Sequence, residues 1–232
     1  MKTIGIVGAM EEEIALLKNN TEIISAKNIV GTDFFMGKMF GKNVVLVRSG
    51  IGKVNAAVCT QVLIDMYGVD YIINTGVAGS INKDLGIGDI VISNDLLQHD
   101  FDTSATGDKP GVIPRLHEST FKADEELVRI AEEVSKEYIQ NQNVFVGRIA
   151  TGDQFIANSS DKERIWNNFK PYCVEMEGAA IAQTCYLNKI PFVVIRSMSD
   201  SADEGACSNF EEHVEKVANN SSIVVEQMIK EL

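Results

Sequence analysis

Short apolar runs alternate with longer segments of helical period along this 232-residue chain. The strand-like runs lie at residues 3–8, 33–39, 43–48, 70–75, 89–93, 143–150 and 190–197. The segments with helical periodicity lie at residues 11–18, 53–67, 123–140, 177–188 and 209–231. Strands that alternate with long helices are typical of an α/β fold with a largely parallel sheet. The pattern therefore predicts an α/β architecture.

Two segments depart from this alternation. Residues 34–44 resemble a hairpin with Gly41 at or near its turn, which would make the sheet mixed. The segment His99–Ser119 carries Pro110, Gly111 and Pro114 and predicts a long irregular connection. Loops of that length in compact domains are usually functional or disordered. Because no shift in composition marks a boundary, residues 1–232 are expected to form a single domain.

The charge and composition of the chain limit the kinds of molecule that it is expected to bind. The formal net charge is −12 and Lys and Arg form no cluster, so nucleic acid and anionic membrane surfaces are not expected partners. No apolar run approaches the roughly 18 residues of a membrane span. The first apolar run breaks at Glu11, so we interpret it as a strand and not as a signal peptide. The four scattered cysteines predict reduced, buried thiols and a cytoplasmic protein.

Acidic residues follow three of the apolar runs. Glu11–Glu13 come after the first strand, Glu175 and Glu177 flank Met176, and Asp200 follows the run that ends near residue 197. Acids at helix starts are also favoured by the helix dipole, which is the simplest alternative. However, ligands of open α/β sheets bind at the carboxyl ends of strands. Three carboxylates gathered there predict acid/base chemistry on a small polar substrate.

Other common site patterns are absent from the sequence. Residues 49–55 lack the first glycine and the hydroxyl residue of a phosphate loop, since Val47 and Val54 stand in those places. Residues 5–8 do not form a dinucleotide fingerprint. His99, with Asp100 and Asp102, is more typical of a solvated loop than of a metal site. No metal and no cofactor are therefore expected.

Six segments taken together resemble a known family. They are residues 8–13, 49–57, 74–79, 152–156, 174–177 and 197–200. In order and spacing they are similar to the bacterial 5'-methylthioadenosine/S-adenosylhomocysteine nucleosidases, over essentially the whole chain. The resemblance implies a nucleoside phosphorylase-like α/β/α sandwich with a mixed central sheet. It also implies cleavage of the N-glycosidic bond to release adenine, a role in methionine salvage and S-adenosylmethionine recycling, and a homodimer.

The resemblance also assigns catalytic roles by matched position. Asp200 would protonate N7 of adenine, with Ser199 orienting it, and Glu13 would activate the attacking water. Glu177 would accept hydrogen bonds from the ribose hydroxyls, and Arg196 would lie near the substrate. An acid on the leaving group and a base on water suit an oxocarbenium-like transition state. We therefore expect Asp200 to be protonated, and Glu13 and Glu177 to be ionised.

The remaining matched positions surround the substrate. Phe155 would stack on adenine and the Ile156 backbone would read its edge. The ribose and thioalkyl pockets, together with other substrate contacts, would involve Ala9, Met10, Ile51, Gly79, Glu175, Met176 and Phe210. Because the residues around the sulfur are apolar, we expect methylthioadenosine, S-adenosylhomocysteine and 5'-deoxyadenosine all to be accepted.

One position of the sequence differs from the family pattern, and three alternative functions have to be weighed. The family usually has a small hydroxyl residue where this chain has Val77, so a hydroxyl contact to ribose is lost. A purine nucleoside phosphorylase of the same fold would need a cationic cradle for phosphate, and Glu13 would repel phosphate. Aminodeoxyfutalosine hydrolysis is a second enzyme alternative. A non-catalytic nucleoside-binding protein would be expected to lose one of the three acids, and Glu13, Glu177 and Asp200 are all present.

Overall fold

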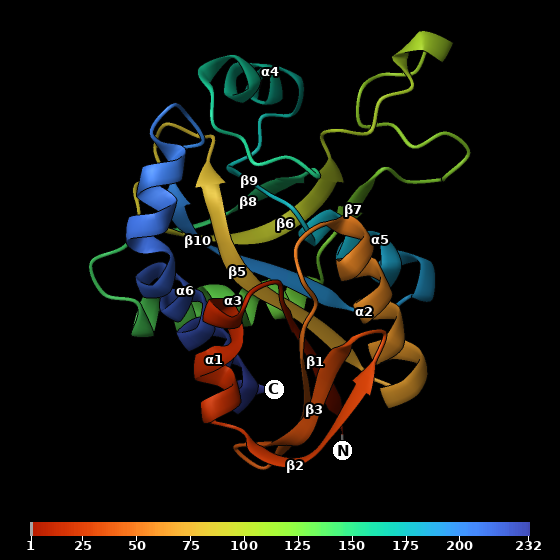
Figure 1. Ribbon diagram of the computed structural model, residues 1–232, viewed down its shortest axis with the longest axis vertical. Helices are drawn as coiled ribbons and strands as arrows, with labels where there is room; N and C mark the ends of the chain where they lie inside the picture. The colour runs from red at the N-terminus through yellow and green to blue at the C-terminus, as the bar shows by residue number, and fades with distance from the viewer. Residues whose placement is uncertain (1) are drawn as a thin grey trace.

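A mixed sheet of ten strands forms the centre of the computed structural model, which describes residues 2–232 (Figure 1). The strands are β1 (Thr3–Gly8), β2 (Glu22–Ile29), β3 (Thr32–Met39), β4 (Lys42–Arg48), β5 (Tyr71–Ser80), β6 (Ile90–Gln98), β7 (Thr120–Lys122), β8 (Val144–Thr151), β9 (Cys173–Glu175) and β10 (Phe192–Asp200). The helices are α1 (Glu11–Asn19), α2 (Lys53–Tyr67), α3 (Glu125–Tyr138), α4 (Ser159–Phe169), α5 (Gly178–Asn188) and α6 (Ala206–Glu231).

The sheet topology brings several strand ends together. The order is β10-β6-β8-β9-β5-β1-β4-β3-β2, and β10 also pairs with β5, so that five strands close into a circuit. Strands β4, β1, β5 and β10 are mutually parallel neighbours, whereas β6 runs antiparallel to β10 and β9 antiparallel to β5. The carboxyl ends of the four parallel strands therefore lie along one edge, as the position of the acids predicted.

Helices cover both faces of the sheet, which confirms the α/β/α prediction (Figure 1). On one face α1, α3 and α6 bury Leu17, Leu127 and Val224 against β1, β4 and β6. On the other face α2 and α5 pack side by side and bury Leu63 and Ile181. Each helix contributes an apolar stripe, and burial of that surface stabilises the layered arrangement.

The central strands are longer than their apolar runs. Strand β5 continues to Ser80 and β10 to Asp200, and all nine residues of β10 are buried. The strands thus extend beyond the predicted runs at residues 70–75 and 190–197, and the expectation that Asp200 follows its strand is wrong. Polar residues at these strand ends stay in the sheet because parallel neighbours supply their backbone hydrogen bonds.

The structure confirms the predicted hairpin and contains several short or exposed elements that the sequence pattern did not predict. The hairpin at residues 34–44 is confirmed, with Phe40 and Gly41 both at positive φ in its two-residue turn. A second hairpin joins β2 to β3 through Val30 and Gly31, but β2 is exposed along most of its length and carries no apolar alternation. Strands β7 and β9 have only three residues each, and α4 was also missed.

The segment between β6 and β7 extends away from the rest of the fold (Figure 1). Apart from a 3₁₀ turn at Ser104–Thr106 it is irregular, as predicted. All four cysteines are unpaired, but Cys207 is exposed, so the expectation that all four are buried is wrong for that residue. Cys207 is the second residue of α6 and follows the buried Ala206.

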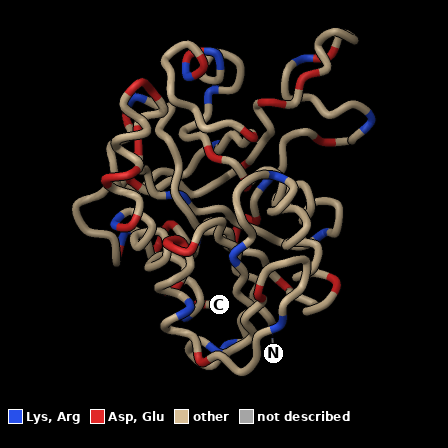
Figure 2. The backbone as a smooth tube through the Cα atoms, viewed as in Figure 1, with Lys and Arg blue, Asp and Glu red and all other residues tan. Residues whose placement is uncertain are grey.

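Charged residues are spread along the whole length of the backbone (Figure 2). Lys and Arg are interspersed with the more numerous Asp and Glu, which give the chain its net charge of −12. Within residues 2–232, no helix combines the length and apolarity that a bilayer crossing requires.

Candidate functional site

Glu13 occupies the first turn of α1 and turns its carboxylate back toward the end of β1. Its Oε2 atom accepts hydrogen bonds from the backbone N–H groups of Ala9 at 2.6 Å and Met10 at 3.0 Å, and Oε1 accepts from the Val77 N–H at 3.0 Å. Burial raises the pKa of Glu13, against the opposing effects of the Arg196 charge and these three donors. Its two oxygens are therefore fixed at the junction of β1 and β5.

Asp200 ends β10 on the other side of the same edge. Its Oδ1 atom accepts from the Ala202 N–H at 2.8 Å, and Oδ2 lies 2.8 Å from the Ser199 hydroxyl, which donates to it. Burial raises the pKa of this carboxyl as well, although both hydrogen bonds oppose the rise. A raised pKa favours the protonated form that a general acid requires.

Glu177 precedes α5 and accepts one hydrogen bond, from the Gly52 N–H at 2.8 Å to its Oε1 atom. Burial and the neighbouring Glu175 carboxylate raise the pKa of Glu177 to about 8, and Arg196 opposes this rise. The raised pKa disfavours the ionised form of Glu177 in the free site, because Arg196 is one cation facing several acids. This direction is opposite to the one expected for a carboxylate that is ionised before substrate binds.

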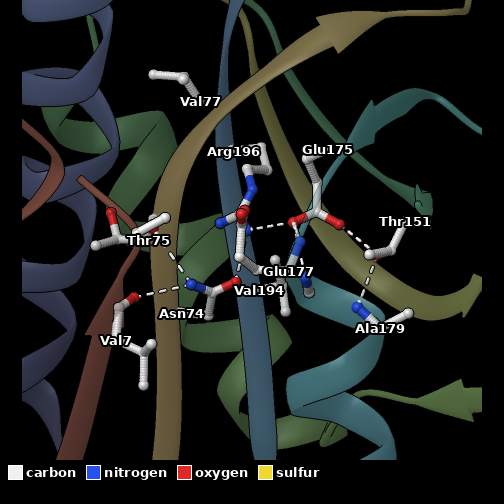
Figure 3. A network of polar contacts seen from close by, with 12 residues as sticks. Val7, Asn74, Thr75, Val77, Thr151, Glu175, Glu177, Ala179, Val194 and Arg196 are labelled. Carbon is white, nitrogen blue, oxygen red and sulfur yellow. Dashed lines mark hydrogen bonds and ion pairs between the residues drawn. The ribbon is translucent and has the colours of Figure 1, made fainter. Parts of the chain in front are cut away.

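Glu175 and Arg196 form a buried ion pair beneath the site (Figure 3). Arg196 Nη2 lies 2.5 Å from Glu175 Oε2 and 2.6 Å from Asn74 Oδ1. The same Glu175 oxygen accepts from the backbone N–H groups of Glu177 and Gly178, and the Thr151 hydroxyl donates to its other oxygen. The carboxylate of Glu175 thus fixes the backbone at Glu177, where α5 begins.

One cavity opens where these strand ends meet. Its volume is about 590 Å³ when the open space at its mouth is included. The side chains of Glu13, Glu177 and Asp200 reach it although the residues are only 4%, 7% and 3% exposed. The other lining residues are Ala9, Met10, Ile51, Val77, Ala78, Gly79, Gln154, Phe155, Ile156, Val174, Glu175, Met176, Ser199 and Phe210.

The cavity divides into a polar floor and apolar walls. Phe155 and Phe210 meet edge to face with ring centroids 5.7 Å apart, and Met10 and Val77 pack in a cluster with Phe210. No Lys or Arg stands among the lining residues. In the part of the chain that the structure describes, no three His, Cys, Asp or Glu side chains are arranged as metal ligands.

Of the positions expected at the substrate, Arg196 alone does not line the cavity. Its guanidinium is fully buried, and Glu175, Asn74 and the Ile195 carbonyl accept its hydrogen bonds. The expectation of a direct substrate contact is therefore corrected to a position below the floor. A buried cation has to pair with an anion, and Glu175 is the carboxylate within reach.

Two glycines that the sequence pattern did not single out allow this geometry. A Cβ atom at Gly76 would lie 2.5 Å from Glu13 Oε1 and 3.2 Å from Arg196 Nη1, so only glycine fits between them. Gly52 has φ of 96° and presents the N–H that Glu177 binds. Gln154, Ala78 and Val174 also line the cavity without having been predicted to do so, and Val77 lines it at the position that the resemblance placed beside the ribose.

Comparison with known proteins agrees with this fold and site. Residues 3–230 match the family model of the phosphorylase superfamily. The chain is 42% identical to the 5'-methylthioadenosine/S-adenosylhomocysteine nucleosidase of Tolumonas auensis, over 99% of each sequence. The Neisseria meningitidis nucleosidase of the same name, solved with methylthio-immucillin-A, superposes with a TM-score of 0.95 at 40% identity and full coverage of both chains.

A futalosine hydrolase of Helicobacter pylori is also similar, with 37% identity and a TM-score of 0.94 over 100% of this chain and 98% of that one. The fold and site thus define a member of the phosphorylase superfamily. Within it, the chain belongs to the 5'-methylthioadenosine/S-adenosylhomocysteine nucleosidase family.

The raised pKa of Glu177 predicts a pH-dependent penalty on stability. Because its folded-state pKa of about 8 exceeds the ordinary 4.5, the stability associated with protonation is present below pH 4.5 and is lost as the pH rises through 8. The difference in the free energy of unfolding between Glu177→Gln and the wild type should therefore rise in favour of the variant by at least about 1 kcal/mol between pH 5 and pH 8.5. Thermal unfolding at both pH values measures this gain.

The exposed Glu163→Gln is the matched control, since the same chemical change removes no buried charge. If the stability of the wild type and that of Glu177→Gln changed by the same amount between pH 5 and pH 8.5, the prediction would be contradicted.

Proposed function

We propose that the chain hydrolyses the N-glycosidic bond of 5'-methylthioadenosine and S-adenosylhomocysteine, and also of 5'-deoxyadenosine, releasing adenine and the 5-substituted ribose. The observation that carries this proposal is a cavity bordered by three buried carboxyls, Glu13, Glu177 and Asp200, without any lining cation. Such a site suits a neutral substrate that becomes cationic in the transition state. The whole chain, residues 1–232, acts as one nucleosidase domain in this proposal.

Asp200 serves as the general acid on the adenine side. Its raised pKa keeps a proton available, and the Ser199 hydroxyl and Ala202 N–H fix the two oxygens in place. Transfer of that proton to N7 of adenine makes the base a neutral leaving group. General acid catalysis of this kind contributes typically 10²–10⁴-fold to a rate.

Glu13 and Glu177 act on the ribose side. Oε1 of Glu13 accepts only the Val77 N–H among the described residues, so it retains a lone pair for the attacking water. Glu177 accepts from Gly52 and can take a hydrogen bond from a ribose hydroxyl. Glu13 acts in its ionised form and takes a proton from the water as that water attacks the anomeric carbon and the bond to adenine breaks. The positive charge that develops on the sugar favours the ionised form of Glu177, so the stabilisation by Glu177 is greatest in the transition state.

The apolar walls account for the two ends of the substrate. Phe155 offers a ring face for adenine, and the Ile156 backbone lies beside it for contact with the edge of the base. Met10, Ile51, Met176 and Phe210 provide an apolar surface for the 5' substituent. An apolar pocket distinguishes a methylene by only about 1–3 kcal/mol, so several 5' substituents are accepted.

Methionine salvage and S-adenosylmethionine recycling are the proposed context, because both substrates are by-products of S-adenosylmethionine use. The names of the relatives support this context. Four unpaired cysteines are consistent with a reducing compartment, and we propose that the protein is cytoplasmic.

A homodimer is the proposed assembly. On the outer surface of α2 and α5, Val54 is 73% and Leu187 is 59% exposed, and Val58 lies on the same helix as Val54. At the mouth of the cavity, Ile51 and Phe155 are also about half exposed. Apolar surface of this kind marks an interface, and a twofold dimer is the commonest closed assembly. A second copy would shield the cavity mouth from water.

Hydrolysis should proceed without phosphate. Phosphate would enter a cavity whose lining includes four acidic residues and no cation, which disfavours phosphate relative to water as the nucleophile. Adenine release from methylthioadenosine should therefore have the same rate with and without phosphate, and the sugar product should be free 5-methylthioribose. Formation of a ribose 1-phosphate would show a phosphorylase instead. Aminodeoxyfutalosine assayed in parallel distinguishes the hydrolase alternative.

Asp200→Asn should lower kcat by about 10²–10⁴-fold, because the amide keeps the shape of the side chain but has no transferable proton. Thermal unfolding should be no easier than in the wild type, since burial disfavours the charge that is removed. The exposed Asp84→Asn is the matched control. A folded Asp200→Asn enzyme with near-normal turnover would exclude Asp200 as the general acid.

Sedimentation equilibrium at micromolar concentration should give the mass of two chains. Val58→Glu places a charge on the apolar α2 surface and should shift the equilibrium to one chain, with a loss of activity. Ile24→Glu on the exposed strand β2 is the control and should leave the mass unchanged. A fully active wild type sedimenting as one chain would disprove the dimer.

A further inference from the structure

Three charged residues outside the cavity form a closed ring of hydrogen bonds with one another. Lys53 begins α2, Asp100 follows β6, and Asp153 follows β8. Lys53 Nζ lies 2.6 Å from Asp100 Oδ1, the Lys53 backbone N–H donates to Asp153 Oδ1 at 2.8 Å, and the Asp153 N–H donates to Asp100 Oδ2 at 2.9 Å. These three residues form what we term the Lys53 bracket.

The bracket joins the two chain segments that face each other across the cavity mouth. On one side, Lys53 is covalently next to Gly52, whose N–H binds Glu177 at 2.8 Å. On the other side, Asp153 is followed directly by Gln154, Phe155 and Ile156, which line the cavity. Lys53, Asp100 and Asp153 are not themselves lining residues.

The bracket is anchored to the body of the fold. Gln98 in β6 accepts a further hydrogen bond from Lys53 Nζ at 3.0 Å and donates to Gln183 in α5 at 2.7 Å. The side chains of Lys53 and Asp100 are only 19% and 16% exposed, so solvent screens their attraction weakly. Although burial would raise the pKa of Asp100, Lys53 and the Asp153 N–H hold it below its ordinary value.

We propose that Lys53, Asp100 and Asp153 are positioning residues that fix both the Gly52 N–H against Glu177 and the segment carrying Phe155. The inference rests on the proposed function, because it assigns these two groups to the ribose and to adenine. Displacement of a catalytic group by about 1 Å can cost on the order of 10²-fold in rate. Loosening the bracket would therefore weaken the chemistry through Glu177 and Phe155 without removing any group that touches substrate.

Lys53→Met tests the proposal, since it keeps the aliphatic stem and removes the cation. It should lower kcat/KM for methylthioadenosine by about 10–100-fold, with part of the loss in kcat. Lys53→Arg, which restores a cation and donors, should recover most of that loss. Asp100→Asn should resemble Lys53→Met, and the double variant should be little worse than either single one, because the same ring is broken in each.

The pH profile separates positioning from a general loss of stability. The charges that act on Glu177 are those of Glu175, Arg196 and Glu13, and the Gly52 N–H stabilises its ionised form. When Gly52 is released, the acidic limb of kcat/KM should therefore move to higher pH in Lys53→Met and Asp100→Asn. A merely structural role would leave that limb in place.

Asp95→Asn is the matched control. The Asp95–Arg148 pair joins the same strands, β6 and β8, at 2.6 Å and with similar burial, but it does not contact residues 52 or 152–156. This variant should keep the wild-type kcat/KM and pH profile. Equal losses in Asp95→Asn and Lys53→Met, or folded bracket variants with wild-type kcat/KM and pH profile, would overturn the proposal.

The wild-type control distinguishes failure of this inference from failure of the proposed function. Absence of adenine release by the wild type refutes the function. Normal release by the wild type and by all bracket variants refutes only the positioning role.

Discussion

A single buried guanidinium, that of Arg196, is the interaction on which the rest of the site depends. It bonds directly to Glu175 and Asn74, and its charge also acts on Glu13 and Glu177. Three buried glutamates thus share one buried cation. Because an uncompensated charge is costly away from water, the cluster retains protons in the free protein. Because the glutamates outnumber the cation, their ionised forms are disfavoured in the free protein. In the proposed mechanism, a cationic transition state would favour them.

The position of the cation also separates the roles of the acids. Glu175 takes the direct ion pair and two backbone N–H groups, so its carboxylate serves the architecture below the cavity. Glu13 and Glu177 interact with the charge of Arg196 without a direct hydrogen bond, and in the proposed mechanism they act on the ribose. Burial is the largest cause of the raised pKa of Asp200, and the Asp203 carboxylate adds to it. The proposed general acid and general base thus lie in different environments at the same edge of the sheet.

The site combines rigid and adjustable parts. Glu13, Asp200 and the Arg196–Glu175 pair are held by the ends of β1, β5, β9 and β10, where sheet hydrogen bonds fix the backbone. The apolar rim, in contrast, lies on connections between elements, at Ile51 and at Phe155. The strand backbone thus fixes Glu175, Arg196 and Asp200 directly, and it fixes Glu13 of α1 through the Val77 N–H group that this carboxylate binds. The rim, in contrast, depends on contacts made by its neighbours.

The sequence by itself determined the α/β class, most strands and helices, and the acids at strand ends, because apolar periodicity and local charge are properties of neighbouring residues. Together with the family motifs it predicted nearly every residue of the cavity. Only the tertiary structure decided that Arg196 lies under the floor, that burial raises the pKa of Glu177, and that Gly76 makes room for Glu13. It also revealed β2 and the Lys53 bracket. Burial, pKa and a contact between residues 53, 100 and 153 depend on which strands become neighbours, and no local pattern encodes that choice.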